Sequence, residues 1–268
     1  MNNSPRISII MGVYLPNREY LFTSVESIVS QTFKDWELII CDDGSNNIET
    51  DALLSEISKI DSRIKIIGYK KNMGLAYALN TCITNSYGEY IARQDDDDCS
   101  QSDRLSIQVE YLDAHHECSY VGTEAIVFDD KGQWGHYSLI ESPEPRSFLW
   151  NSPFIHPSVM FRREALSAVN GYRVAPETER VEDYDLFMRL VAAGYNGHNL
   201  KSELYEYRIN RSVKKYRPLR IRFNEAKVRR QGFKALELGI VAAPYVIKPI
   251  FIGLIPGFMM NAIGKAKY

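Results

Sequence analysis

Apolar residues in the first part of the chain fall into four short runs, separated by segments with a different spacing. The runs are Ile7–Val13, Trp36–Cys41, Ile64–Ile67 and Gly88–Ala92. Each is nearly continuous, which is typical of a strand buried on both faces of a sheet. After the first run, Leu21, Val25 and Ile28 recur at helical spacing, and the later segments show similar stripes. This alternation predicts an α/β fold with a Rossmann-like, doubly wound, mostly parallel sheet that has helices on both faces.

Beyond the fourth strand the pattern becomes less regular. A helix is expected to begin at Ser102, because serine is a favoured residue at helix N-termini. Strands are predicted at Tyr120–Phe128 and Ser158–Phe161, and a short helix at Glu164–Val169. Asp183–Ala193 has an amphipathic pattern and is predicted to be a helix.

The C-terminal part of the chain combines a basic stretch with an apolar one. Twelve Lys or Arg and three Asp or Glu residues lie between Lys201 and Lys234, although the whole chain has a net charge of −2. Residues 240–263 are mostly apolar, with one lysine (Lys248) and no acid, and three prolines interrupt them. Because a spanning helix needs about 20 uninterrupted apolar residues, this pattern favours a segment in the membrane interface. A solvated basic helix and a tail packed on the domain are the alternatives.

Composition excludes several classes of protein. The chain is 45% hydrophobic and 25% charged, and its near-neutral net charge gives no reason to expect nucleic-acid binding. The four cysteines form no C-x-x-C pair, which argues against a disulfide framework or a zinc knuckle and favours a reducing compartment. The polar segment Met1–Arg6 is not a signal peptide. A cytoplasmic protein, peripheral at the inner face of the cell membrane, is therefore predicted.

Three polar features follow strands of the predicted sheet: Tyr14, Asp42–Asp43 and Asp95–Asp98. The carboxyl ends of parallel strands meet at one edge, and ligands of such sheets bind there. The sequence pattern therefore gathers these side chains on one rim. At the second of them, the stretch Asp42–Ser45 is either a plain turn or the source of a carboxylate that binds a base or ribose.

Four consecutive carboxylates need a physical explanation, because like charges at short range disfavour one another. In an extended segment, Asp95 and Asp97 would face one way, and Asp96 and Asp98 the other. A divalent cation between these oxygens and a diphosphate would relieve the repulsion, and oxygen ligands suit Mg²⁺ or Mn²⁺. A solvated loop is the alternative. An EF-hand loop is excluded, because Ser100 stands where glycine is required.

These motifs together resemble the family 2 glycosyltransferases of the GT-A fold, inverting enzymes typified by bacterial surface-polysaccharide transferases. The matching stretches are ISIIMGVY (7–14), SIVSQTF (27–33), WELIICDDGS (36–45), NMGLAYALN (72–80), GEYIARQDDDD (88–98), DRL (103–105), HPSVMFR (156–162) and EDYDL (182–186). The resemblance implies that residues 1–210 form a catalytic GT-A domain that binds a nucleotide-sugar. Residues 211–268 are then a basic and apolar extension outside the shared core.

The resemblance also implies roles for individual residues on the donor side. Tyr14 and Asp43 line the pocket of the nucleotide base, with Asp43 as a hydrogen-bond partner. Asp95, Asp96 and Asp97 match the D-x-D motif of nucleotide-sugar binding. Within it, Asp97 is the expected ligand of Mn²⁺ or Mg²⁺, and Asp95 lies near the ribose or the metal.

On the acceptor side, Asp183 matches the catalytic base of the family. Acids in a first helical turn also suit the helix dipole, so Glu182 and Asp183 have a purely structural alternative. His156 and Glu182 are expected near the acceptor or the diphosphate, and a structural histidine before proline is the alternative for His156.

The implied reaction transfers a sugar from a UDP-sugar to the hydroxyl of a carbohydrate or lipid-linked acceptor, in surface-polysaccharide or glycolipid synthesis. One rival is a sugar nucleotidyltransferase, but such enzymes carry a glycine-rich loop after the first strand, where this chain has Tyr14–Arg18. The other rival is a nucleotide-sugar-binding protein without activity. The presence of both Asp97 and Asp183 argues against it.

Overall fold

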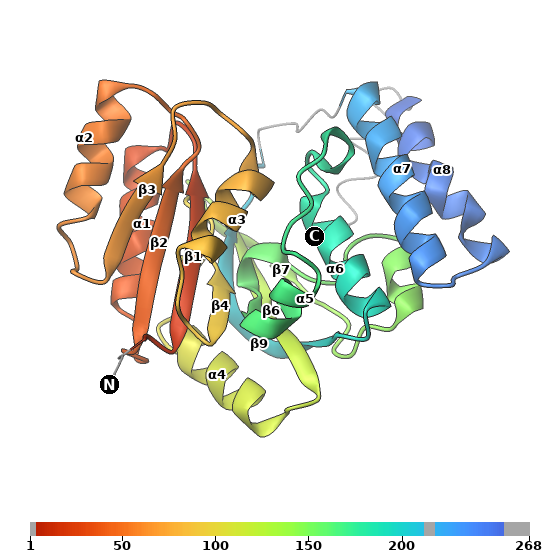
Figure 1. Ribbon diagram of the computed structural model, residues 1–268, viewed down its shortest axis with the longest axis horizontal. Coiled ribbons are helices and arrows are strands. Elements are labelled where there is room, and N and C mark those ends of the chain that lie inside the picture. The colour runs from red at the N-terminus through yellow and green to blue at the C-terminus, as the bar shows by residue number, and fades with distance from the viewer. Residues whose placement is uncertain (1–3, 212–217, 255–268) are drawn as a thin grey trace.

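The computed structural model describes residues 4–211 and 218–254 (Figure 1). One nine-stranded sheet runs through the molecule in the order β3-β2-β1-β4-β8-β6-β9-β5, with β7 paired to β6. Its first half contains β1 (Ile7–Val13), β2 (Trp36–Asp42), β3 (Ile64–Gly68) and β4 (Tyr90–Arg93). These four strands are parallel, as predicted, so their carboxyl ends meet at one edge.

The second half of the sheet is mixed. It consists of β5 (Cys99–Ser100), β6 (Cys118–Asp129), β7 (Gly132–Tyr137), β8 (Met160–Arg162) and β9 (Asn196–Arg208). β8 is antiparallel to both β4 and β6, whereas β9 is parallel to β6 and antiparallel to β5. Because β5 pairs with β9, the last strand in the chain is brought next to the segment that follows β4.

Helices cover both faces of the sheet, which confirms the doubly wound α/β architecture. One core lies beneath α1 (Arg18–Val29), α2 (Ile48–Ile57) and α4 (Arg104–Ala114). The other lies beneath α3 (Leu75–Thr84), α6 (Glu182–Ala192) and α7 (Leu219–Ala235). The alternating helical stripes in the sequence are the apolar sides of these helices, which supply buried residues to the two cores.

Two predicted boundaries were wrong. α4 begins at Arg104, with Asp103 rather than Ser102 at the N-cap position. Ser158 does not open a strand, because η2 (His156–Ser158) is a 3₁₀ turn with proline in its first positions, and β8 starts at Met160. The short helices α5 (Arg163–Ala168), η1 (Pro145–Leu149) and η3 (Pro176–Thr178) connect these elements to α6.

The described part of the C-terminal extension packs on the rest of the chain. Val228 and Phe233 of α7 and Leu236 join the same core as α6. After η4 (Ile240–Ala242), α8 (Ala243–Leu254) lies alongside α7 and contains Pro249. No helix among the described residues is long and apolar enough to cross a membrane. The rest of the apolar stretch, from residue 255 onward, lies outside the described residues.

Candidate active site

The loops after β1 and β2 are tied together at the rim. Asp42 Oδ1 accepts hydrogen bonds from the backbone N–H of Ser45 at 3.0 Å and from its hydroxyl at 2.6 Å. The Ser45 hydroxyl oxygen in turn accepts from the N–H of Leu15 at 2.9 Å. Tyr14, beside this bond, is 51% exposed. The ring is therefore accessible to a ligand, and its contact with a nucleotide base stays a prediction.

Asp43 is buried and has three donors within the protein. It accepts from the Tyr69 hydroxyl at 2.7 Å and from the backbone N–H groups of Met73 and Gly74 at 2.7 and 2.9 Å. These bonds fix the loop that leads into α3. Gly44 has φ +74°, and a Cβ there would lie 2.5 Å from the backbone of Lys71, so only glycine fits this close approach. The predicted contact of Asp43 with the base is not tested by these bonds.

The acidic run forms a turn rather than an extended segment. Residues 96 and 97 occupy the turn between β4 and β5. As a result, one oxygen each of Asp95, Asp97 and Asp98 lies within 4.8 Å of the others. The predicted alternation, with Asp98 facing away from Asp95 and Asp97, was therefore wrong. We refer to residues 95–98 below as the acidic turn.

The buried carboxyl group of Asp98 fits a cation ligand. Its Oδ1 accepts from the N–H of Arg208 at 2.7 Å, whereas its Oδ2 has no hydrogen-bond partner among the described residues. Burial raises the pKa of Asp98 well above its usual range, and the charges of Asp95 and Asp97 raise it further. A divalent cation would offset both effects, and the all-oxygen donor set suits Mg²⁺ or Mn²⁺.

The other two acids of the turn differ in their surroundings. Burial raises the pKa of Asp96 to about 7, and the charges of Asp97 and Asp95 add to this effect. Asp95 forms an ion pair with Arg93, which is completely buried. No motif in the sequence indicates Arg93, because a basic residue at a strand end has no distinctive spacing.

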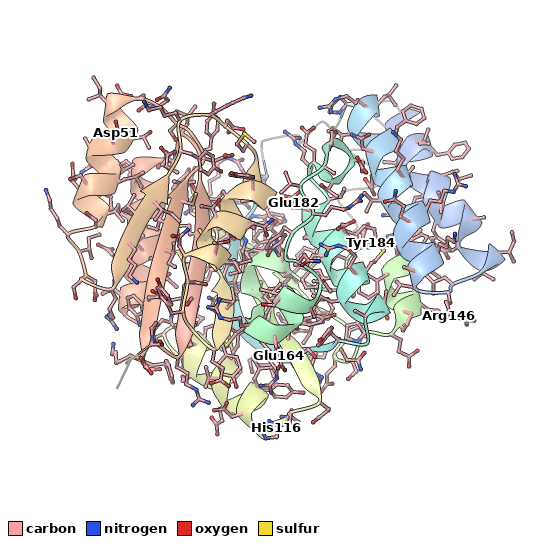
Figure 2. All side chains as sticks on the ribbon, in the orientation of Figure 1. Asp51, His116, Arg146, Glu164, Glu182 and Tyr184 are labelled. Atoms are coloured by element: carbon pink, nitrogen blue, oxygen red, sulfur yellow. The ribbon has the colours of Figure 1, made fainter. Side chains whose placement is uncertain are left out.

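A cleft of about 910 Å³ joins the acidic turn to α6. Asp95 and Arg93 line it together with Glu182 and Asp183, the first two residues of α6. Figure 2 shows Glu182 at the start of α6, on the side toward α3. Burial raises the pKa of Glu182 to about 7, with a further contribution from the charge of Asp183. Carboxylates from two distant parts of the sequence thus face one cavity.

An ion-pair network supports the start of α6. Asp185 accepts from Arg173 Nε at 3.0 Å and from Arg189 Nε at 2.7 Å. Arg189 also donates to the backbone carbonyls of Val169 and Gly171, at 2.7 and 2.8 Å. These bonds connect α6 to the loop before it. The position of Asp183 is therefore determined by charged groups on both sides of that loop.

His156 lines the same cleft but is largely buried. Its Nε2 lies 2.6 Å from the hydroxyl of Tyr172. Burial lowers the pKa of His156 well below its usual range, so the ring is neutral. A neutral imidazole that is already hydrogen-bonded fits the structural interpretation, and its contact with an acceptor or diphosphate stays a prediction.

The extension also contributes to the cleft wall, through Glu225 and Arg229 of α7. Arg229 is buried, and its Nε donates to Glu225 at 3.0 Å. It also donates to the carbonyls of Leu149 and Trp150 at 3.0 and 3.1 Å. The cleft is therefore not confined to residues 1–210. The family resemblance could not reveal this, because it ends before α7.

Comparisons with known proteins agree with this fold. Residues 8–169 match the family described as glycosyl transferase family 2. The chain is 38% identical over 267 residues to EpsE of Bacillus subtilis (strain 168), whose name describes a glycosyltransferase; the match covers 100% of this chain and 96% of EpsE. The chain therefore belongs to glycosyl transferase family 2, and it is a transferase enzyme that has the GT-A fold.

Two further matches extend the comparison. The chain is 26% identical to the UDP-Gal:alpha-D-GlcNAc-diphosphoundecaprenol beta-1,3-galactosyltransferase of Escherichia coli, over 98% of this chain and 97% of that enzyme. Among solved structures, the mannosyltransferase PcManGT from Pyrobaculum calidifontis, in complex with GDP-Man and Mn²⁺, has a TM-score of 0.60 at 18% identity. That match covers 98% of this chain and 80% of PcManGT. At this identity the structural likeness shows the fold alone.

Proposed function

We propose that this protein is an inverting, metal-dependent glycosyltransferase that transfers a sugar from a nucleotide-sugar, specifically a UDP-sugar, to an acceptor hydroxyl. The observation that carries the proposal is the shared cleft: Asp95 of the acidic turn and Asp183 of α6 both line it. The E. coli relative is named for a UDP-sugar donor, which supports the choice of nucleotide. Neither relative is named as a nucleotidyltransferase.

On the donor side, Asp95, Asp97 and Asp98 would hold the cation. A bound Mn²⁺ or Mg²⁺ supplies positive charge that stabilises a departing nucleoside diphosphate. The exposed ring of Tyr14 is available to the base; it follows β1, the strand that pairs with β4. Asp43 holds the loop before α3 through its bonds to Met73 and Gly74.

On the acceptor side, Asp183 takes the proton from the attacking hydroxyl, as a general base. The oxygen attacks the anomeric carbon from the face opposite the diphosphate, so one displacement inverts the configuration. Glu182 next to it, with a pKa raised to about 7, holds a proton near neutral pH. A neutral Glu182 avoids a second negative charge beside the base.

The test is a panel of UDP-, GDP- and dTDP-sugars, in which donor turnover is measured with Mn²⁺ and with EDTA. We expect UDP-sugar turnover that needs the metal, and a fall of roughly 10²–10⁴ in D183N with donor binding retained. E164Q, an exposed site on α5, is the control and should behave as wild type. Full activity in EDTA refutes the metal dependence, and wild-type turnover in D183N refutes the role of Asp183 as the general base. Donor binding without any turnover favours the non-catalytic alternative.

We further propose that the acceptor is lipid-linked and that the protein is peripheral at an anionic membrane. The E. coli relative is named for a diphosphoundecaprenol-linked substrate. In the extension, Lys227, Arg230 and Lys234 are exposed on α7, and Ile240 is 86% exposed just beyond it. Cations beside exposed aliphatic side chains are the combination that binds anionic bilayers.

A further inference from the structure

Arg208, the last residue of β9, contacts the acidic turn through both its backbone and its side chain. Its backbone N–H donates to Asp98 Oδ1 at 2.7 Å, and its Nε donates to the carbonyl oxygen of Asp97 at 2.8 Å. The two bonds hold consecutive residues of the turn. Both residues belong to the cluster whose carboxylate oxygens lie within 4.8 Å of one another.

The guanidinium group of Arg208 is itself held on several sides. It lies over the ring of Tyr20, 3.9 Å from the centroid, and over the ring of Phe128 at 4.4 Å. Its Nη1 forms an ion pair with Asp130 at 2.8 Å, and the Tyr20 hydroxyl donates to the same carboxylate at 2.9 Å. The side chain is only 13% exposed. An arginine stacked and paired in this way has little rotamer freedom, so it is a rigid support for the turn.

A cation so close to a metal site needs a reason, because its charge opposes that of Mn²⁺. The ion pair with Asp130 offsets much of that charge at the outer end of the guanidinium. At the inner end, Nε donates to the backbone carbonyl of Asp97, so this bond leaves the carboxylate oxygens of the turn available to a metal. The contacts therefore fit a role in fixing the turn, since the carboxylates of Asp95, Asp97 and Asp98 repel one another and would otherwise separate.

We propose that Arg208 is a positioning residue for the divalent cation: it holds the Asp97–Asp98 backbone so that the three carboxylates converge on one point. This inference rests on the metal dependence proposed above. Residues that orient metal ligands without touching the metal typically change its affinity by roughly 10–100-fold when they are replaced.

The experiment measures Mn²⁺ binding to the full chain from the electron paramagnetic resonance signal of free Mn²⁺, without any substrate. R208M keeps the backbone N–H and the length of the side chain but removes the guanidinium. We expect its dissociation constant for Mn²⁺ to rise roughly 10–100-fold. The matched control is R211M, because Arg211 is the next arginine along the chain and bonds Asp129, at 2.8 and 2.9 Å, instead of the turn. Its dissociation constant should stay within about twofold of wild type.

Circular dichroism establishes that each variant is folded. If R208M does not fold, R208K is the second variant, because lysine keeps the charge but lacks the planar guanidinium whose Nε and Nη1 bond Asp97 and Asp130. Weaker Mn²⁺ binding by a folded Arg208 variant, with R211M unchanged, supports the proposal. Wild-type affinity in the folded Arg208 variant overturns it, and so does an equal loss in R211M. If the wild-type chain binds no Mn²⁺, the proposed metal dependence is refuted. This outcome is distinct from a failure of the Arg208 proposal, in which the wild-type chain binds Mn²⁺.

Discussion

The carboxylates of the site differ in how many donors the protein gives them, and this difference separates their roles. Asp43 receives three hydrogen bonds and holds a loop in place. Asp98 accepts a backbone bond at Oδ1 and interacts with the Tyr205 side chain, and its buried Oδ2 has no partner within hydrogen-bond geometry among the described residues. Glu182 is half-buried beside another acid, and the pKa of its side chain is raised to about 7. A buried acid with few donors is stabilised by a cation or by a proton.

The raised pKa of Glu182 predicts a pH dependence of stability. The usual value for glutamate is 4.5 and the folded value is about 7. Between these values the folded state binds more protons than the unfolded state, so the free energy of unfolding falls as the pH rises. E182Q removes this contribution. We expect E182Q and wild type to have similar melting temperatures at pH 4.5, and E182Q to melt higher at pH 8, both measured without metal.

The control is E164Q, at an exposed site on α5 shown in Figure 2. Its melting temperature should differ from that of wild type by the same small amount at both pH values. A difference between E182Q and wild type that does not change with pH would contradict the buried, protonated state of Glu182.

At the level of residues, the sequence indicated acids that line the cleft, but not the partners of these acids. Asp95 and Asp183 follow from motif positions, and both line the cleft as a common site requires. The inclusion of Asp98 depends on the turn at residues 96–97, and a run of four identical residues does not reveal such a turn. Arg93 pairs with Asp95, two residues further along the chain, whereas Arg208 reaches the acidic turn from β9. The contact of Arg208 depends on strand order, which hydrophobic spacing does not determine.

At the level of elements, α7 lines the cleft although it lies after residues 8–169, which match the family description. Arg229 and Glu225 form a buried ion pair whose side chains are 2% and 11% exposed. Arg229 also holds the segment that contains Leu149 and Trp150. The basic character of this helix therefore has two origins: Arg229 is buried against the cleft, whereas cations such as Lys227 face outward.

Removal of one partner of this pair should destabilise the folded protein. R229M leaves Glu225 buried without its main partner and the carbonyls of Leu149 and Trp150 without a donor. We expect the free energy of unfolding in urea to fall by about 3–5 kcal/mol. R230M, at the exposed neighbouring position, should change it by less than about 0.5 kcal/mol. Equal stability of R229M and wild type would mean that α7 is not anchored through this pair.

The elements themselves were predicted unevenly, for a physical reason. β1 to β4 lie in the parallel half of the sheet, so their apolar runs stand out in the sequence. β9 (Asn196–Arg208) was missed, because it is partly exposed along much of its length and rich in polar residues. β5 has only two residues. These two strands bring Arg208 to the acidic turn, so the missed elements are also the ones that complete the candidate metal site.

At the level of the whole molecule, the extension and the N-terminal helices lie at opposite ends (Figure 1). α7 and α8 stand side by side at one end, and α2 lies at the other. Phe223, Lys227, Arg230 and Lys234 recur every three or four residues along α7 and are exposed, so they share one side of the helix. Arg230 and Lys234 line a shallow depression together with Ile240. An apolar tip beside cations at one end of the molecule would orient the cleft relative to a bilayer.

We therefore expect the wild-type protein to sediment with vesicles that contain phosphatidylglycerol and much less with vesicles of phosphatidylcholine alone. Insertion of one isoleucine side chain is worth about 1.5–3 kcal/mol, so I240D should weaken vesicle binding by about tenfold or more. The matched control is I48D on α2, because Ile48 is also 86% exposed but lies at the other end of the molecule. If I48D and I240D lose binding equally, the α7–α8 end is not the docking face. If the wild-type protein does not bind anionic vesicles at low salt, the membrane proposal fails. The proposals for the metal site and the catalytic base do not depend on this result.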